Sequence, residues 1–358
     1  MHKLLYIFAA VLLVGCNETE KADLNFFPAK NDNFKYSGRT EAKETGMALI
    51  NSAASVSTRV FGDSCVIYLE SGNDQHYYVS LQLNNGYLGR YRIEKDSIKI
   101  PLPKQEEGAL LQISKDTEAS NGAVIFKGLA AAKIKSLPKD NRPEIEFIGN
   151  SITCGMGADL REIDCGEGEW YDQHNAYLAY GPRVARALDV NFELSCVSGM
   201  GMYRNWNDED QPVMPNVYPN LYLNSDTSKK ADLASDSPEI VSIALGTNDL
   251  SLGDGEKERT EFDPEIFTQN YIAFVETIFN YYPKTKVALI SSPMIGEKED
   301  DILVTCLMNV KAHFEEAPVF VFNFESMDAG GCTSHPDIED HRAMAQALIP
   351  FYKEILNL

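Results

Sequence analysis

The chain has few basic residues, few histidines and few tryptophans. Its 358 residues include 32 Lys and Arg against 53 Asp and Glu, which gives a formal net charge of −21. A surface with this excess of negative charge repels a phosphate backbone, so we expect no nucleic-acid partner. The sequence also lacks CxxC and HExxH motifs and has only six histidines, so it predicts no metal site and no cofactor.

Long apolar runs are scarce as well. Near the N-terminus, the run from Leu4 to Val14 is too short to cross a bilayer as a helix. Its end, Leu13-Val14-Gly15-Cys16, resembles a bacterial lipobox, which implies that Cys16 is acylated and that the residues before it are removed. We therefore expect an exported lipoprotein of the outer membrane, on its periplasmic face or at the cell surface. Residues 1–16 are then signal and lipobox, and residues 17–32 a polar tether. A plain secretory signal with an incidental Cys16 is the alternative.

Six of the seven cysteines follow Cys16. An oxidising compartment permits disulfides, but six thiols allow 15 complete pairings and the spacing selects none of them. The six are Cys65, Cys154, Cys165, Cys196, Cys306 and Cys332.

Residues 33–137 have the pattern of a β domain. Short apolar or alternating runs such as Tyr77 to Leu83 are separated by turn residues, and Asn84-Asn85-Gly86 is a hairpin signal. We expect a β-sandwich of jelly-roll-like form. Prolines and polar residues between Ser136 and Pro143 then indicate a linker.

Residues 144–358 alternate between strand and helix patterns. This alternation predicts a parallel sheet with helices on both faces, a three-layer α/β/α domain whose ligands bind beyond the carboxyl ends of the strands. The predicted strands are Ile145 to Ile148, Phe192 to Cys196, Glu239 to Leu245, Lys286 to Ser291 and Pro318 to Phe322. The predicted helices are Ala176 to Leu188, Phe267 to Ile278 and Ala343 to Tyr352.

Three predicted strand ends and one C-terminal loop carry residues suited to chemistry. Ser151 follows the first strand and is a nucleophile candidate, with ordinary helix capping as the alternative. Glycines around Gly199 can leave backbone N–H groups facing a ligand, and the Asn248 amide can donate to an oxyanion. His335, ahead of the last helix, can accept the Ser151 proton. We expect His341 to cap or pack instead.

These segments also resemble a known family. Gly149-Asn150-Ser151-Ile152-Thr153, Ser198-Gly199, Gly246-Thr247-Asn248-Asp249 and His335-Pro336 look like the four blocks of the SGNH (GDSL-type) hydrolases. The resemblance implies that Ser151 is the nucleophile and His335 the general base. It also implies an oxyanion hole made by the Ser151 and Gly199 amides and the Asn248 side chain. The absence of a GxSxG motif separates the chain from the α/β-hydrolases.

The resemblance extends over both predicted domains. Four further segments are similar to carbohydrate esterase family 2, namely Tyr36-Ser37-Gly38-Arg39-Thr40, Asp116-Thr117-Glu118-Ala119-Ser120, Asn175-Ala176-Tyr177 and Met202-Tyr203-Arg204-Asn205. This implies a serine esterase that removes O-acetyl groups from polysaccharides or oligosaccharides of the xylan or mannan type, without a cofactor. A lipid or thioester hydrolase of the same superfamily, and a carbohydrate-binding protein with reduced catalysis, are the alternatives.

The chain departs from the family pattern at two places. Asn150 stands where the first block usually has Asp, and Thr333 and Ser334 stand where Asp and Trp often precede the catalytic His. An Asp–His–Ser triad therefore lacks an obvious third member. We expect a Ser–His dyad in which a backbone carbonyl orients His335.

Loss of that Trp removes a face on which a sugar can stack. Trp170, Trp206 and Tyr203 are the candidates for a substrate-binding surface elsewhere. The sequence predicts neither the ester position on the sugar nor the oligomeric state.

Overall fold

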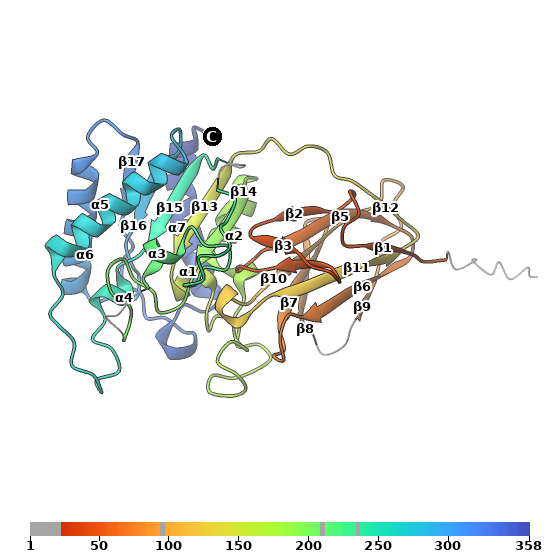
Figure 1. Ribbon diagram of the computed structural model, residues 1–358, viewed down its shortest axis with the longest axis horizontal. Helices are drawn as coiled ribbons and strands as arrows, with labels where there is room; N and C mark the ends of the chain where they lie inside the picture. Colours follow the sequence, from red (N-terminus) through yellow and green to blue (C-terminus); the bar gives the residue numbers. More distant parts are fainter. Residues whose placement is uncertain (1–22, 94–96, 208–211, 234–236) are drawn as a thin grey trace, which may run out of the picture.

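The computed structural model describes residues 23–93, 97–207, 212–233 and 237–358, and it places two domains side by side (Figure 1). The N-terminal domain is built of antiparallel strands, and the C-terminal domain is a parallel sheet with helices around it. Within the described part of the chain, no helix is both long and apolar enough to cross a membrane. Cys16, and residues 17–22 of the predicted tether, lie outside the described residues.

The N-terminal domain contains two sheets of six strands each. In the first sheet the order is β3-β4-β11-β6-β9, with β1 also paired to β11; in the second it is β12-β5-β10-β7-β8, with β2 also paired to β5. The strands are β1 (Asn25–Pro28), β2 (Lys35–Ser37), β3 (Thr40–Ala42), β4 (Met47–Leu49), β5 (Ser55–Phe61), β6 (Ser64–Ser71), β7 (Tyr78–Leu83), β8 (Gly86–Arg92), β9 (Ser97–Pro101), β10 (Ala109–Lys115), β11 (Val124–Ala131) and β12 (Lys133–Lys135).

Alternation of apolar and polar residues explains how these sheets pack. Along β6 every second side chain is buried, as expected for strands with one face in a core. Val56, Leu69, Leu81, Ile113 and Phe126 come from five strands of the two sheets and share one apolar cluster. The predicted β domain is therefore present, but it begins earlier than expected. Residues 25–28 were predicted to lie in the tether, and they form β1, which pairs with β11.

The C-terminal domain contains a five-stranded parallel sheet of order β14-β13-β15-β16-β17. Its strands are β13 (Glu144–Gly149), β14 (Asn191–Cys196), β15 (Ile240–Ala244), β16 (Lys286–Ile290) and β17 (Val319–Phe322). The α-helices are α1 (Ser151–Cys154), α2 (Tyr180–Leu188), α3 (Met214–Val217), α4 (Thr247–Leu250), α5 (Pro264–Tyr281), α6 (Glu297–His313) and α7 (Ile338–Leu356). Single 3₁₀ turns are η1 (Ala119–Asn121), η2 (Ala176–Leu178) and η3 (Cys332–Ser334).

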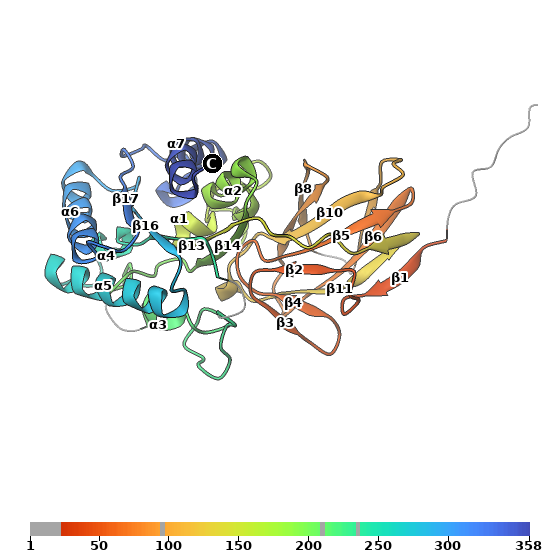
Figure 2. The same cartoon turned by 90° about the horizontal axis from the view of Figure 1, so that it is seen from above.

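The helices cover both faces of this sheet (Figure 2). Val241 and Val287 point into a cluster with α5 and α6, whereas Ile240 and Ala288 point into one with α2 and α7. The domain is therefore three-layered, as predicted. Helix α6 was not predicted, although Leu303, Cys306, Leu307 and Val310 are buried at helical spacing. The predicted helix from 176 to 188 is broken at residue 179 into η2 and α2.

Buried polar contacts join the two domains. Arg39, only 4% exposed, donates from Nη1 to the carbonyl oxygens of Tyr218 and Asn220, at 2.8 and 2.6 Å. Asn51 donates to the Leu194 carbonyl at 2.7 Å. Because buried donors need partners, these contacts fix the N-terminal domain on the C-terminal domain rather than leaving it loosely linked.

Candidate active site

Ser151 lies at the carboxyl end of β13, where the strand turns into α1. The Asn150 side chain caps α1 by accepting a hydrogen bond from the Ile152 amide at 3.1 Å. A Cβ on Gly149 would lie 2.0 Å from Thr153 Oγ1, so only glycine fits before the turn. Ser151 is 7% exposed. The turn therefore presents the Ser151 hydroxyl at the edge of the sheet, beneath neighbouring loops.

His335 reaches Ser151 from the loop between η3 and α7. Its Nε2 lies 2.8 Å from Ser151 Oγ, across 184 positions of sequence. Its Nδ1 lies 3.1 Å from the Thr333 carbonyl oxygen and 3.1 Å from Thr333 Oγ1. Thr333 Oγ1 donates to the Cys332 carbonyl, so both Thr333 oxygens can accept from Nδ1–H. With its proton on Nδ1, the imidazole presents Nε2 as the acceptor for the Ser151 hydroxyl.

A backbone carbonyl thus occupies the place that a carboxylate has in a triad. Among the residues that the structure describes, no carboxylate hydrogen-bonds to His335. Burial lowers the pKa of His335, and this favours the neutral imidazole that a general base requires.

Two disulfides hold the loops of this site. Cys154 of α1 is bonded to Cys196 at the end of β14, which ties the turn after Ser151 to the neighbouring strand. Cys165 is bonded to Cys332, the first residue of η3, which ties a distant loop to the His335 segment. Cys65 and Cys306 are buried free thiols. The spacing of the cysteines could not select these pairs, because they depend on which loops meet in the fold.

Gly199 and Asn248 lie on two further loops at the same edge. Gly199 has φ +78°, and a Cβ there would meet no atom within 4 Å, so the loop is open at this point. Within the described chain, neither the Ser151 nor the Gly199 amide donates a hydrogen bond to another protein group. Asn248, 6% exposed, donates from Nδ2 to the Met200 carbonyl at 2.8 Å. That bond uses one Nδ2 proton and leaves the second available.

Asp249 fixes the loop that follows Gly199. Its buried carboxylate accepts from the amides of Met202, Tyr203 and Arg204 at 2.8 to 3.2 Å. Burial raises the pKa of Asp249 to about 6. The sequence analysis included Asp249 in the Gly246-Thr247-Asn248-Asp249 segment but did not predict that its carboxylate holds this loop. The one indication in the sequence was its position next to Asn248.

Glu118 was missed altogether as a site residue. This residue of the N-terminal domain is fully buried, and its Oε2 accepts from the Ser198 amide at 2.8 Å while Oε1 accepts from the Ser198 hydroxyl. His174 Nε2 lies 3.3 Å from Oε1. The segment around Glu118 resembles the family, but no local feature of the sequence indicates that the Glu118 carboxylate binds Ser198 in the other domain.

The aromatic candidates differ in exposure. Trp170 and Trp206 are 48% and 45% exposed, so each offers an indole face to solvent. Tyr203 packs on the Phe262 and Phe267 rings, and its hydroxyl accepts a hydrogen bond from the Asp263 amide. These contacts leave little of the Tyr203 side chain available to a sugar. His341 is fully buried and its Nδ1 accepts from the Tyr180 amide at 3.2 Å, as expected for a packing residue.

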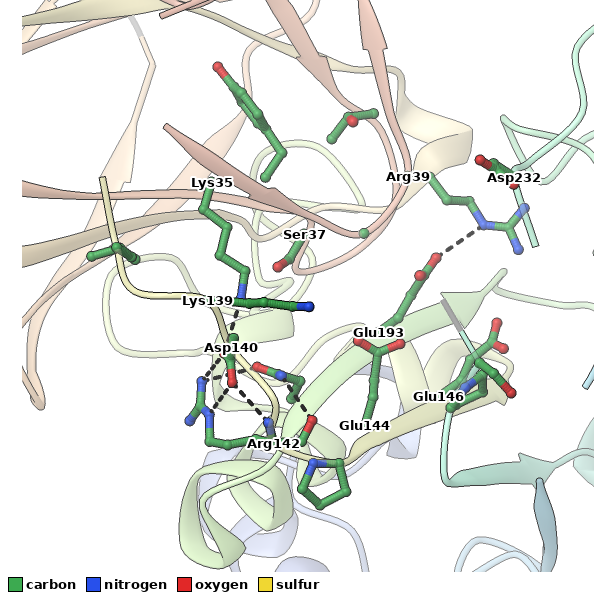
Figure 3. Close-up of a pocket in the computed structure, with 18 of the residues that line it drawn as sticks. Lys35, Ser37, Arg39, Lys139, Asp140, Arg142, Glu144, Glu146, Glu193 and Asp232 are labelled. Atoms are coloured by element: carbon green, nitrogen blue, oxygen red, sulfur yellow. Dashed lines mark hydrogen bonds and ion pairs between the residues drawn. The ribbon is translucent and has the colours of Figure 1, made fainter. Parts of the chain in front are cut away.

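A separate cavity of about 700 Å³ lies at the opposite end of the sheet (Figure 3). The linker and the amino ends of β13 and β14 line it, whereas Ser151 follows the carboxyl end of β13. Its charged groups are largely paired with one another. Asp140 is 3.0 Å from Lys35 and 2.7 Å from Arg142, and Arg39 is 3.4 Å from Glu193. No group of three or more described His, Cys, Asp or Glu side chains could hold a metal ion.

Comparison with known proteins agrees with this architecture. Residues 147–323 match the model of the GDSL-like Lipase/Acylhydrolase family. Two proteins of Cellvibrio japonicus named acetylxylan esterase / glucomannan deacetylase are similar: one is 30% identical, covering 67% of each chain, and the other 23% identical, covering 99% of this chain and 98% of its own. A family two carbohydrate esterase from Clostridium thermocellum, solved in complex with cellohexaose, superposes with a TM-score of 0.79 at 24% identity, over 90% of this chain and 99% of that chain. The resemblance seen in the sequence is thereby confirmed, and the chain belongs to the GDSL-like lipase/acylhydrolase family.

Proposed function

We propose that this protein is a serine esterase that removes O-acetyl groups from polysaccharides or oligosaccharides of the xylan or mannan type. The observation that carries the proposal is the 2.8 Å contact between Ser151 Oγ and His335 Nε2, with Nδ1 held by Thr333. Relatives named acetylxylan esterase / glucomannan deacetylase support the choice of substrate.

The reaction follows from the positions of these groups. Ser151 Oγ attacks the acetyl carbonyl carbon as its proton passes to His335 Nε2, and the carbonyl oxygen becomes an oxyanion. The Ser151 and Gly199 amides and Asn248 Nδ2 donate to that oxyanion. When the tetrahedral intermediate collapses, the bond between the acetyl carbon and the sugar oxygen breaks, and His335 gives its proton to that oxygen. The sugar leaves with a free hydroxyl, and the acetyl group stays on Ser151 as an acetyl-enzyme.

Water completes the cycle by the same route. His335 accepts a proton from water, the resulting hydroxide attacks the acetyl carbonyl, and a second oxyanion forms in the same place. Its collapse breaks the bond to Ser151 Oγ, which regains its proton from His335, and acetate leaves. No step draws on a group other than the substrate, water and these residues.

The sugar-binding part of the proposal rests on the two exposed tryptophans. Trp170 is edge-on to His174, with ring centroids 4.7 Å apart, and His174 contacts Glu118 beside the oxyanion loop. Trp206 donates its amide to the Gly199 carbonyl at 2.8 Å. Both indoles are thus attached to segments that border the proposed oxyanion hole, where a stacked sugar ring would hold its acetyl group near Ser151.

The test is acetate release by protein lacking residues 1–16 from acetylated xylan, acetylated glucomannan, p-nitrophenyl acetate and p-nitrophenyl octanoate. We expect release from the acetylated substrates by the wild type, none by Ser151→Ala, and normal release by the control Ser64→Ala in strand β6. Preference for the octanoate would favour a lipid hydrolase. A folded wild type that releases nothing would favour a carbohydrate-binding protein.

We also propose that the protein is an exported lipoprotein anchored through Cys16. Strand β1, the first described element, lies at the end of the N-terminal domain away from the hydrolase domain (Figure 1), so an anchor there would leave the N-terminal domain between the membrane and the hydrolase domain. Expression with a radioactive fatty acid tests this, since Cys16→Ser should abolish labelling and membrane association. The jelly-roll-like form of the N-terminal domain stays a proposal supported by its two antiparallel sheets.

A further inference from the structure

Glu118 is a buried carboxylate that the proposed mechanism does not use. It follows β10 in the N-terminal domain and caps the 3₁₀ turn η1. Its backbone is held firmly, because the buried Lys115 ammonium donates to the carbonyl oxygens of Thr117 and Glu118, each at 2.7 Å. A carboxylate without solvent access is costly unless several partners satisfy it, so its partners indicate what it does.

One partner, Ser120, belongs to the same turn and donates from its hydroxyl to Oε2 at 3.3 Å. The other partners of the carboxylate lie in the hydrolase domain. Ser198 binds both carboxylate oxygens, its amide donating to Oε2 at 2.8 Å and its hydroxyl to Oε1, and His174 lies 3.3 Å from Oε1. Burial alone would raise the pKa of Glu118, but the contacts from His174 and Ser198 hold it below its ordinary value. The carboxylate is therefore charged, and charge-assisted bonds to Ser198 are strong ones.

Ser198 immediately precedes Gly199, whose amide is a proposed oxyanion donor. A residue bound at both its amide and its hydroxyl has little freedom to rotate, so the chain enters Gly199 in one direction. Gly199 itself is open, with no atom within 4 Å of a Cβ and φ +78°, and so it adds no steric restraint of its own. Beyond it, Asp249 holds the next turn of the loop. Gly199 thus stands in the chain between two segments that are each held by a buried carboxylate.

We propose that Glu118 is a positioning residue for the oxyanion hole, so that the N-terminal domain supplies part of the catalytic geometry across the domain boundary. The inference rests on the proposed function, because it assigns Glu118 to the Gly199 donor of that mechanism. Displacement of a catalytic group by about 1 Å can cost on the order of 100-fold in rate. Loss of Glu118 should therefore slow the chemical step without weakening the binding of a small ester.

The experiment compares Glu118→Ala, Glu118→Gln and Ser198→Ala in the full chain lacking residues 1–16, with p-nitrophenyl acetate as substrate. Glu118→Ala should lower kcat roughly 30- to 100-fold and change KM less than about threefold. Glu118→Gln should recover part of the loss, because its amide oxygen can still accept from the Ser198 amide. Ser198→Ala keeps the bond to that amide and should cost less, roughly fivefold.

The double variant of Glu118 and Ser198 distinguishes a positioning role of Glu118 from a general effect on stability. If Glu118 acts through Ser198, the double variant Glu118→Ala/Ser198→Ala should be no slower than Glu118→Ala alone, because the pair loses its interaction only once. Glu70→Ala is the matched control: this carboxylate of the same domain pairs with Lys127 at 2.8 Å far from the site, and its kcat should equal that of the wild type.

Three results would overturn the inference: Glu118→Ala with wild-type kcat, a double variant whose losses multiply, or a kcat loss equal to the loss of folded protein measured by circular dichroism. If Glu118→Ala does not fold, Glu118→Gln and Ser198→Ala decide together, since wild-type kcat in both variants removes the link to Gly199. A wild type without esterase activity would instead refute the proposed function, so the two failures are distinguishable.

Discussion

Replacement of Asn248 by Ala removes one proposed oxyanion donor and little else. Asn248 is 6% exposed at the start of α4, and its Nδ2 also donates to the Met200 carbonyl at 2.8 Å. Loss of one such donor costs roughly 3 kcal/mol of transition-state stabilisation, which is about 100-fold in kcat. We therefore expect kcat on p-nitrophenyl acetate to fall about 100-fold in Asn248→Ala, with KM nearly unchanged.

Asn248→Ala should also lower the free energy of unfolding, and the structure sets limits on this loss. The Met200 carbonyl loses its partner, and an unsatisfied buried acceptor costs about 1 to 3 kcal/mol. Met200 is only partly buried, so water can replace the lost donor and the cost should lie near the lower limit. Set against a typical stability of about 5 to 15 kcal/mol, this loss leaves the protein folded at assay temperature. Thermal unfolding of the variant should show a single transition a few degrees lower.

Two further variants test the assignment of Asn248 to the oxyanion hole. Asn248→Asp keeps the size of the side chain but cannot donate and places a negative charge beside the oxyanion, so its kcat should be lower than that of Asn248→Ala. Asn270→Ala removes a similar amide-to-carbonyl bond of 2.9 Å on the exposed face of α5, and its kcat should not change. A loss below threefold in Asn248→Ala, or wild-type activity in Asn248→Asp, would refute the assignment of Asn248 to the oxyanion hole.

Three further predictions follow from the site. Because burial lowers the pKa of His335, the acid limb of the kcat/KM profile should have its midpoint below the ordinary value of about 6.5, activity being lost only where His335 becomes protonated; a midpoint above that value would contradict this. Gly199→Ala introduces no clash but disfavours φ +78°, so kcat should fall at least about tenfold as the amide reorients, whereas an unchanged kcat would show that this amide is not a donor. Cys165 is exposed while the other disulfide is buried, so mild reduction and mass mapping should find the Cys165–Cys332 bond opened first, with kcat falling in step; opening without loss of activity would show that this bond does not hold His335.

Much of the site could be predicted because each of its blocks follows a recognisable strand. Ser151, Ser198 and Asn248 come after β13, β14 and β15, which are neighbours in the sheet. In a parallel sheet the carboxyl ends of adjacent strands meet at one edge, so knowing the strands is enough to bring these residues together. His335 was a candidate from its place ahead of the last helix, but a loop histidine has no strand pattern of its own, so its assignment as the base needed the resemblance to the family.

The contacts that cross long stretches of sequence could not be predicted. Glu118 and Ser198 are 80 positions apart and in different domains, and nothing in either segment specifies the other. The disulfide partners Cys165 and Cys332 are separated by 167 positions. Such pairs depend on how the N-terminal domain docks and how the loops lie, whereas local patterns report only which face of a strand or helix is apolar.

The His335 loop explains how the site works with a carbonyl in place of a carboxylate. Thr333 and Ser334 have φ of 52° and 58°, a left-handed conformation that costs side-chain-bearing residues roughly 1 to 2 kcal/mol each. It turns the Thr333 carbonyl back onto His335 Nδ1. The cost is offset by restraints on both sides, since Cys332 is tied to Cys165 and donates to the Gly157 carbonyl at 2.9 Å, and the His335 carbonyl accepts from Gly331 at 2.8 Å. Thr333 and Ser334 form this turn, so a strained and well-restrained backbone, rather than a charged side chain, orients His335.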